Sequence, residues 1–249
     1  MESVFDPGAV LLFSPHLDDA AISCGMLLAA SAQSHVVTLL AGAPVSDSGV
    51  RDWDARCGFP SSVGAMAQRR IEDGAAMGIL DTHAHYEDFL DSQYGALPSA
   101  DAVAAAMLRK IAAWRPDTVV VPLGLHHCDH ERVHEGALLA MQSAGGAVRW
   151  LAYEDLPYAA RAGVVQSRLN ALASAAVMAT RVAVAPLWRN SAVIRHAGAL
   201  KTRAIAAYAS QLAAVGIEAD AFSEPGSERY WLLQPNARES PAGKSGLAW

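Results

Sequence analysis

The sequence predicts an α/β fold with a mostly parallel sheet and helices on both of its faces. Short apolar runs alternate along the 249-residue chain with longer segments of helical period, which is the pattern of βαβ units. Most connections are short, and right-handed crossovers between parallel strands place helices on both faces of the sheet. No internal repeat and no long linker divides the chain. We therefore predict a single Rossmann-like domain over residues 1–233 and a loose, polar tail over residues 234–249.

The first half of the chain holds the clearer elements. Residues 9–14 form a continuous apolar run, as expected for a strand that is buried on both faces. The predicted strands of this half are residues 9–14, 35–41, 82–89 and 118–123. The predicted helices are residues 19–31, 65–80 and 100–114. Residues 42–62 are rich in Gly, Pro, Ser and Asp, so we predict a long loop there.

The second half is less regular. Residues 130–143 have helical period and end at Gly145-Gly146, and residues 149–154 form a further predicted strand. Beyond residue 160 we predict a strand over 181–185, a helix over 192–214 and an edge strand over 229–233.

Composition and charge limit the class of protein. The formal net charge of −6 argues against a nucleic-acid partner, which needs a basic surface. The N-terminal segment carries Glu2 and Asp6 and lacks an apolar run of membrane-spanning length, so we expect neither a secretory signal nor a membrane partner. Three cysteines without CxxC spacing indicate reduced thiols in a cytoplasmic protein. The oligomeric state stays open between a monomer and a homo-oligomer.

Two short clusters combine imidazole and carboxylate groups directly after predicted strands. The first contains His16, Asp18 and Asp19, and the second runs from His127 to His130. Functional groups collect beyond the carboxyl ends of parallel strands, so the clusters are expected to meet. Asp at the start of a helix is also a common N-cap, but four His and Asp groups at two strand ends favour a metal site.

The residue types suit a catalytic zinc ion, which takes three protein ligands and keeps a fourth position open. Two adjacent acids, Asp18 and Asp19, permit one to bind the metal and the other to act as a base. Asp129 is placed to orient an imidazole ring. Mixed His and Asp sites also accept Fe²⁺ and other divalent ions, so the spacing alone does not fix the metal.

The clusters Ser14-Pro15-His16-Leu17-Asp18-Asp19 and His127-Cys128-Asp129-His130 resemble the (A/P)HPDDE and HxDH motifs of the LmbE-like, or PIG-L, family of zinc-dependent N-deacetylases. Residues 69–72, 153–158, 201–211 and 228–231 are also similar to segments of that family. Two positions depart from the first motif: Leu17 replaces its Pro, and Ala20 replaces its final Glu. Neither position carries a metal ligand or the base in the family.

The resemblance implies a role for each motif residue. It makes His16, Asp19 and His130 the zinc ligands, Asp18 the general base, and His127 the imidazole that stabilises the oxyanion.

The resemblance also extends to substrate contacts. It makes Arg69 a substrate-binding residue and Asp91 a sugar-contacting acid. The positions of two other residues suggest substrate contacts of their own: Arg51, beside a Trp on the long loop, and Glu154, at a strand end on the edge where the clusters lie. Glu154 and its neighbour Asp155 fit a contact to a substrate hydroxyl and a contact to a ligating His equally well.

For several other residues the sequence permits two different roles. Cys128 lies between two motif residues, and we expect its side chain to point away from the metal. His134 lies one helical turn after His130. It could support the metal ligands, but we favour a position on the surface of the helix. Tyr158, Trp188 and Trp231 fit core packing and a substrate-binding wall equally well.

The function predicted from these residues is metal-dependent hydrolysis of an N-acetyl or other N-acyl group on an amino sugar or glycosylated natural product of secondary metabolism. One alternative keeps the zinc but takes a non-sugar N-acyl substrate. Another is a nucleotide-binding α/β domain without hydrolysis, which is disfavoured because Ser14-Pro15-His16 stands where a glycine-rich phosphate loop would follow the first strand.

Overall fold

A computed structural model describes residues 3–45, 49–185, 187, 190–216, 218–224 and 226–236 of the chain. Its strands are β1 (Ser3–Phe5), β2 (Val10–Ser14), β3 (Ser34–Thr38), β4 (His83–Tyr86), β5 (Thr118–Pro122), β6 (Arg149–Tyr153), β7 (Val177–Val184) and β8 (Tyr230–Pro235). Its helices are α1 (Asp19–Ala30), α2 (Asp52–Arg56), α3 (Ser62–Ile79), α4 (Ala100–Trp114), α5 (Cys128–Ala144), α6 (Val164–Ser174), α7 (Ser191–Ala206) and α8 (Ala209–Val215), with short 3₁₀ helices at Gly145–Ala147 and Tyr158–Ala160.

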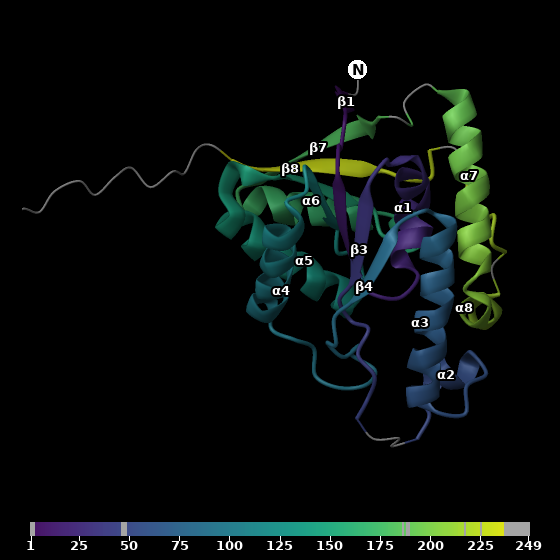
Figure 1. Cartoon of the computed structure of the whole chain (residues 1–249). Helices are drawn as coiled ribbons and strands as arrows, with labels where there is room; N and C mark the ends of the chain where they lie inside the picture. Colours follow the sequence, from purple (N-terminus) through teal and green to yellow (C-terminus); the bar gives the residue numbers. More distant parts are fainter. Residues whose placement is uncertain are drawn as a thin grey trace, which may run out of the picture.

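The eight strands form one sheet in the order β1-β7-β8-β6-β5-β2-β3-β4 (Figure 1). Every neighbouring pair is parallel except the two pairs that β8 makes with β6 and β7. The predicted mostly parallel α/β fold is therefore confirmed. Because β2 lies between β3 and β5 in the middle of the sheet, all five of its residues are buried, as its unbroken apolar sequence predicted.

Helices cover both faces of the sheet, as predicted: α1, α3 and α7 lie on one side and α4, α5 and α6 on the other (Figure 1). Successive side chains of a strand point to opposite faces, so β2 contributes to both cores. Leu12 packs in the core under α1, α3 and α7, whereas Leu11 and Phe13 pack in the core under α4 and α5. This double packing holds the carboxyl end of β2 in place between two helix layers.

The predicted edge strand at residues 229–233 is wrong in its position. β8 lies inside the sheet, where it joins β6 to β7 through two antiparallel pairings. The periodicity of a strand does not identify its partners, and two further strands, β7 and β1, continue the sheet beyond it. β7 begins at Val177, four residues before the predicted strand, and the sequence analysis did not predict β1 or α6.

Other elements also differ from the prediction. The long loop over residues 42–62 contains the short helix α2, and the single helix predicted over 192–214 is two helices, α7 and α8. The helix predicted to begin at residue 130 begins at Cys128, because His127 caps its N-terminus. β8 continues through Pro235, and residues 237–249 of the predicted tail lie outside the described residues, so the division at residue 233 stays a prediction.

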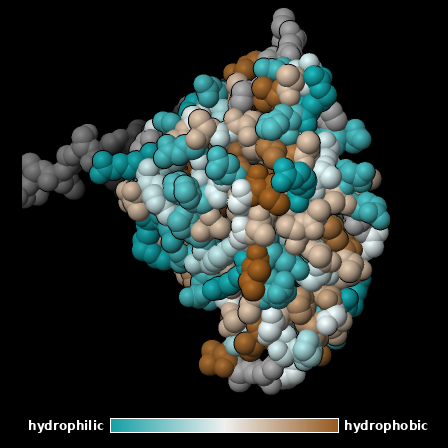
Figure 2. Space-filling view, turned by 45° about the vertical axis from the view of Figure 1, so that its right-hand side comes forward, coloured by the Kyte–Doolittle hydropathy of each residue, from teal (hydrophilic) through white to brown (hydrophobic). Residues whose placement is uncertain are grey.

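None of the described helices combines the length and the hydropathy needed to cross a membrane. Figure 2 shows one face of the molecule, on which brown apolar side chains stand in small areas among teal polar ones. The large apolar side chains that are exposed are Val4, Val45, Val50, Val63, Ile71, Met178 and Val215.

Candidate metal centre and active-site cavity

The two His and Asp clusters of the sequence meet at the carboxyl ends of β2 and β5, which are parallel neighbours. Asp18 and Asp19 stand where β2 passes into α1, and His127 stands where the chain after β5 enters α5. Asp18 occupies the N-cap position of α1, but its carboxylate accepts no capping hydrogen bond from the described backbone. Its side chain lines a cavity instead.

His16, Asp19 and His130 bring three possible ligand atoms to one place. His16 Nδ1 and His130 Nε2 each lie 3.3 Å from Asp19 Oδ2. Zinc bonds of about 2.0–2.1 Å in tetrahedral geometry place neighbouring ligand atoms about 3.3 Å apart. The donor types and their separations therefore fit a zinc ion with three protein ligands.

A carboxylate holds the far side of each of these two imidazole rings. Asp129 Oδ2 lies 2.8 Å from His16 Nε2, and Asp155 Oδ1 lies 2.6 Å from His130 Nδ1. Asp155 is itself fixed by the backbone N–H groups of Gly124 and Leu125, which donate to its Oδ2 at 2.9 and 3.1 Å. Such carboxylate–histidine pairs orient metal ligands and fix which ring nitrogen faces the ion.

The sequence indicated only one of these two carboxylate partners. Asp129 lies inside the second motif, and its predicted role of orienting an imidazole agrees with its contact to His16. Asp155 follows β6, and the sequence left it open between a substrate and a ligating His. The structure places its carboxylate on His130.

The cluster favours positive charge at its centre. Burial by itself would lower the pKa of His16, but its hydrogen bonds to Asp129 and Asp19 raise that pKa well above the ordinary value. Burial also opposes protonation of His130, and Asp19 and Asp155 raise the pKa of its imidazole. The carboxylates thus favour positive charge in the space between the two rings, which is compatible with a divalent metal.

The neighbouring carboxyls Asp18 and Asp19 differ in their electrostatics. Burial and then the charge of Asp19 raise the pKa of Asp18 to about 7, against the opposing effect of Arg69. Burial would also raise the pKa of Asp19, but His130 and His16 lower it below the usual value. Asp19 is therefore ionised between the imidazoles, as a ligand must be, and Asp18 can exchange a proton near neutral pH.

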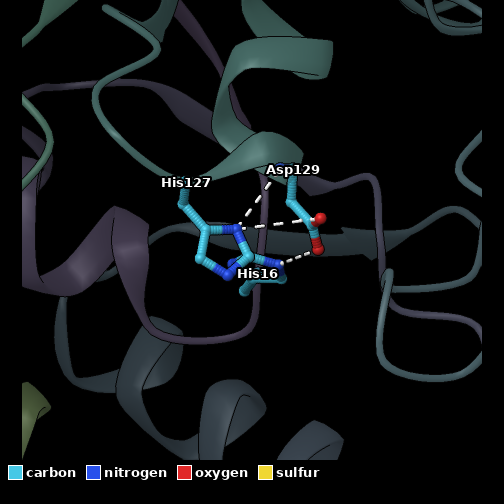
Figure 3. A group of neighbouring side chains, drawn as sticks. All are labelled: His16, His127 and Asp129. Atoms are coloured by element: carbon cyan, nitrogen blue, oxygen red, sulfur yellow. Dashed lines mark hydrogen bonds and ion pairs between the residues drawn. The ribbon is translucent and has the colours of Figure 1, made fainter.

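His127 lies beside His16 and Asp129 (Figure 3). Its ring is 5.5 Å from that of His16, and its Nδ1 accepts a hydrogen bond of 3.3 Å from the backbone N–H of Asp129. The neutral ring therefore carries its proton on Nε2. Burial, and then the neighbouring His16, lower the pKa of His127, so the Nε2–H group is a donor without a net charge at pH 7.

The cavity over this centre has a volume of about 460 Å³. Besides the triad, Asp18 and His127, its polar lining includes the predicted substrate residues Arg69 and Asp91. Arg69 is buried and donates from Nη2 to Gln211 Oε1 at 2.7 Å, while its Nε has no partner among the described residues. These groups can bind a polar ligand next to the metal centre.

Two predicted substrate residues, Arg51 and Glu154, lie outside the cavity lining. Arg51 is exposed at the N-cap of α2, and its neighbour Trp53 lines the cavity instead. Glu154 accepts a hydrogen bond of 3.1 Å from Trp231 Nε1 and lies 3.5 Å from Arg229 Nη1. Side chains of successive residues at a strand end point in opposite directions, so Asp155 rather than Glu154 faces the metal centre.

Tyr158 lines the cavity, a role that the sequence left open. Its ring lies 5.3 Å from the His130 ring in an edge-to-face arrangement and 6.2 Å from that of His127. Trp231, in contrast, holds Glu154, and Trp188 lies outside the described residues. Aromatic type alone could not separate these roles.

Two neighbours of the motif residues lie outside the ligand triad. The exposed Cys128 directs its Sγ to Asp129 Oδ1 at 3.2 Å and is not part of the ligand triad. The preferred prediction of a helix surface for His134 is wrong, because its side chain is buried against β5 and its Nδ1 lies 2.9 Å from the carbonyl oxygen of Pro122. The helical spacing from His130 did not show that this face of α5 packs on the sheet.

Comparison with known proteins agrees with this geometry. The model of the PIG-L family, described as GlcNAc-PI de-N-acetylase, matches residues 11–141. This chain belongs to the PIG-L family. Its match with the 2'-N-acetylparomamine deacetylase of Streptomyces fradiae is 33% identical over 180 residues, which cover 64% of this chain and 60% of that protein. The chain therefore matches over less than two thirds of the length of this curated relative.

Solved structures share the fold of this PIG-L protein. The zinc-inhibited form of teicoplanin deacetylase matches with a TM-score of 0.72 at 22% identity, over 93% of this chain and 100% of that one. The deacetylase of the A40926 pseudoaglycone matches with a TM-score of 0.70 at 25% identity, over 94% and 100% of the two chains. The resemblance inferred from the motifs is thus confirmed at the level of family and fold.

Proposed function

We propose that this protein is a zinc-dependent hydrolase that removes an N-acetyl or other N-acyl group from an amino sugar in a glycosylated natural product. One observation carries the proposal: the triad of His16, Asp19 and His130 opens into a cavity that also holds Asp18 and His127. Membership of the PIG-L family supports it. The similar proteins include deacetylases of 2'-N-acetylparomamine, of teicoplanin and of the A40926 pseudoaglycone, and this supports the sugar-containing substrate.

The residues of the site have distinct tasks in amide hydrolysis. A zinc ion bound by the triad would supply Lewis-acid polarisation of the acyl carbonyl and would lower the pKa of a water molecule. Asp18 takes the proton from the attacking water as the new carbon–oxygen bond forms. His127 donates its Nε2–H to the oxygen on which negative charge develops, which is the arrangement of an oxyanion hole. Asp18 then returns the proton to the leaving nitrogen as the carbon–nitrogen bond breaks, which yields a free amine and a carboxylic acid.

Arg69 and Asp91 are proposed to hold the sugar. Arg69 Nε is a buried donor without a hydrogen-bond partner among the described residues, and Asp91 Oδ2 lies 3.8 Å from His16 Nε2, at the edge of the metal centre. A carboxylate and a guanidinium in such positions can accept from and donate to sugar hydroxyls. A buried donor that a ligand satisfies contributes to specificity, because a ligand without the hydroxyl leaves it unpaired.

Metal analysis together with a substrate panel tests this function. The purified protein is loaded with zinc and given methyl N-acetylglucosaminide, 2'-N-acetylparomamine and N-acetylglycine, and the released acetate is measured. We expect acetate from at least one of the two sugar substrates, its loss on chelation, and its return when zinc is restored. Release from N-acetylglycine alone would instead favour the non-sugar alternative, and the absence of release from all three would contradict the proposal.

A further inference from the structure

The active-site cavity has an apolar wall, by which we mean Ile22, Ile205, Leu212, Val215 and Phe222. These side chains come from α1, α7, α8 and the segment that follows α8, whereas Trp53, Arg69 and Asp91 come from α2, α3 and the loop after β4. The polar Tyr208 and Gln211 also line the cavity, between Ile205 and Leu212 in the sequence. The mechanism of amide hydrolysis uses none of the five apolar residues. Their presence therefore calls for a ligand group that the catalytic residues do not explain.

The apolar wall adjoins the reaction centre. Ile22 follows Asp18 by four residues and Asp19 by three, and its backbone N–H donates to the carbonyl oxygen of Asp18 at 3.0 Å. Residues at these spacings share one face of a helix, so the Ile22 side chain lies next to the two acids. A group attached close to the scissile bond therefore meets the wall at Ile22.

The chemistry of the wall favours a hydrocarbon group over the sugar ring as its occupant. Burying a hydroxyl against apolar side chains costs free energy unless a hydrogen-bond partner is present, and these five side chains supply none. The sugar is better placed at the polar lining. The acyl group is the apolar part of an N-acyl amino sugar, and it is bonded directly to the carbonyl carbon beside Asp18.

On the basis of the proposed function, we infer that the apolar wall binds the hydrocarbon tail of an N-acyl group longer than acetyl. A cavity of about 460 Å³ falls within the range of pockets that take drug-sized ligands, so it has room for more than an acetylated sugar. An apolar aglycone is a less direct fit, because the sugar ring separates it from the scissile amide and from Ile22. The protein is then a deacylase that prefers a short-chain to medium-chain acyl group.

A series of substrates that differ only in the acyl group tests the inference. The zinc-loaded protein is given the methyl β-glycosides of N-acetyl-, N-butanoyl- and N-hexanoylglucosamine, and the released amine is measured. We expect kcat/KM to rise about fourfold for each of the first added methylenes, as burial of apolar carbon predicts. Equal values, or a fall from acetyl to hexanoyl, would overturn the inference and leave the proposed function standing. If none of these substrates releases an amine, this inference fails, and the panel with 2'-N-acetylparomamine decides separately whether the proposed function stands.

A matched pair of variants tests whether the wall itself causes the preference. Val215→Asp places a charge on the apolar wall, and Val63→Asp places one on α3 at a position outside the cavity lining; the two Val side chains are 44% and 39% exposed. We expect the ratio of kcat/KM for hexanoyl over acetyl to fall at least fivefold in Val215→Asp and to stay at the wild-type value in Val63→Asp. An equal ratio in both variants would contradict the assignment.

A third comparison separates the acyl tail from an apolar aglycone. Octyl and methyl β-glycosides of N-acetylglucosamine carry the same acyl group. A higher kcat/KM for the octyl glycoside, without a preference for longer acyl groups, would assign the wall to the aglycone and overturn the inference. We expect the two glycosides to differ by less than the acetyl and hexanoyl substrates do.

Discussion

The molecule holds two groups of three histidines, and the surroundings of the rings differ between them. The first group is His16, His127 and His130 at the candidate metal centre. His16 and His130 in the metal centre each face a carboxylate on one side and Asp19 on the other. The second group, His35, His83 and His85, lies on β3 and β4. Its rings contact each other and Trp114, on which His35 stacks at 4.7 Å.

The electrostatic consequence is opposite in the two groups. The carboxylates raise the pKa of His16 and of His130 against the effect of burial. In the second group, burial and the neighbouring imidazoles lower the pKa of His35 and of His85. Both sets of described His, Cys, Asp and Glu residues that come close enough to hold a metal ion contain His16. The comparison teaches that anionic support, rather than the number of imidazoles, makes a cation site.

The largest expected effect is on metal content. We predict that His130→Ala lowers the zinc content from about one ion per chain to nearly none, because a catalytic site needs all three protein ligands. His85→Ala, the matched change in the second histidine group, should retain the wild-type content. Elemental analysis after dialysis measures both. Loss of zinc from His85→Ala with full zinc in His130→Ala would reverse the two assignments.

The second effect separates catalysis from metal binding. Asp18→Asn should keep the zinc and lower kcat by about 10³-fold, since the amide cannot accept the proton of the attacking water. Asp52→Asn, an exposed position on α2, is the control and should leave kcat unchanged. The measurements are elemental analysis and the rate of amine release. An Asp18→Asn protein of undiminished activity would remove this residue from the role of base.

A third, smaller effect concerns the carboxylate behind His130. Asp155→Asn should weaken zinc binding about 10- to 100-fold, because the carboxylate orients the ring and increases its basicity. Glu154→Gln changes the adjacent carboxylate, which contacts Trp231 instead, and should leave zinc affinity at the wild-type value. Competition with a chromophoric chelator gives both constants. Equal affinities in the two variants would show that Asp155 does not support the ligand.

The smallest effect is the pH dependence of stability in the zinc-free protein. The folded-state pKa of His85 lies below its unfolded value of about 6.5, so the unfolded chain binds more protons and stability falls as the pH drops through that value. His85→Asn should reduce the fall in Tm between pH 7.5 and pH 5.5. The raised pKa of His16 has the opposite effect on stability. The stability that protonated His16 contributes is present below about pH 6.5 and is lost as the pH rises through its folded-state pKa. Thermal melts at several pH values measure the change. A steeper fall in the variant would show that the second group does not oppose protonation.

The sequence was informative where the physical signal is local. The unbroken apolar runs of β2 and β5 predicted buried parallel strands, and the motif positions after them predicted that His16 and His130 meet. Long-range pairing was not predictable from periodicity, which is why β8 was placed at the edge of the sheet rather than between β6 and β7. The same limit applies to the choice between Glu154 and Asp155, since it depends on the direction in which each side chain leaves the end of β6.

The apolar wall shows the same limit. Its five residues span positions 22 to 222 and come together only because α7 packs on α1 and α8 follows it across the cavity. Each of them has the character of an ordinary core residue in the sequence. Only the packing of the helices identifies them as cavity lining.

The crystal structure of the zinc-loaded protein, with anomalous scattering at the zinc edge, is the most direct test of the account. We predict one strong peak bound by His16, Asp19 and His130, with Asp18 and His127 facing its open position. A peak on His35 and His85, or a zinc ion at the cavity that lacks two of the three predicted ligands, would contradict the central claim.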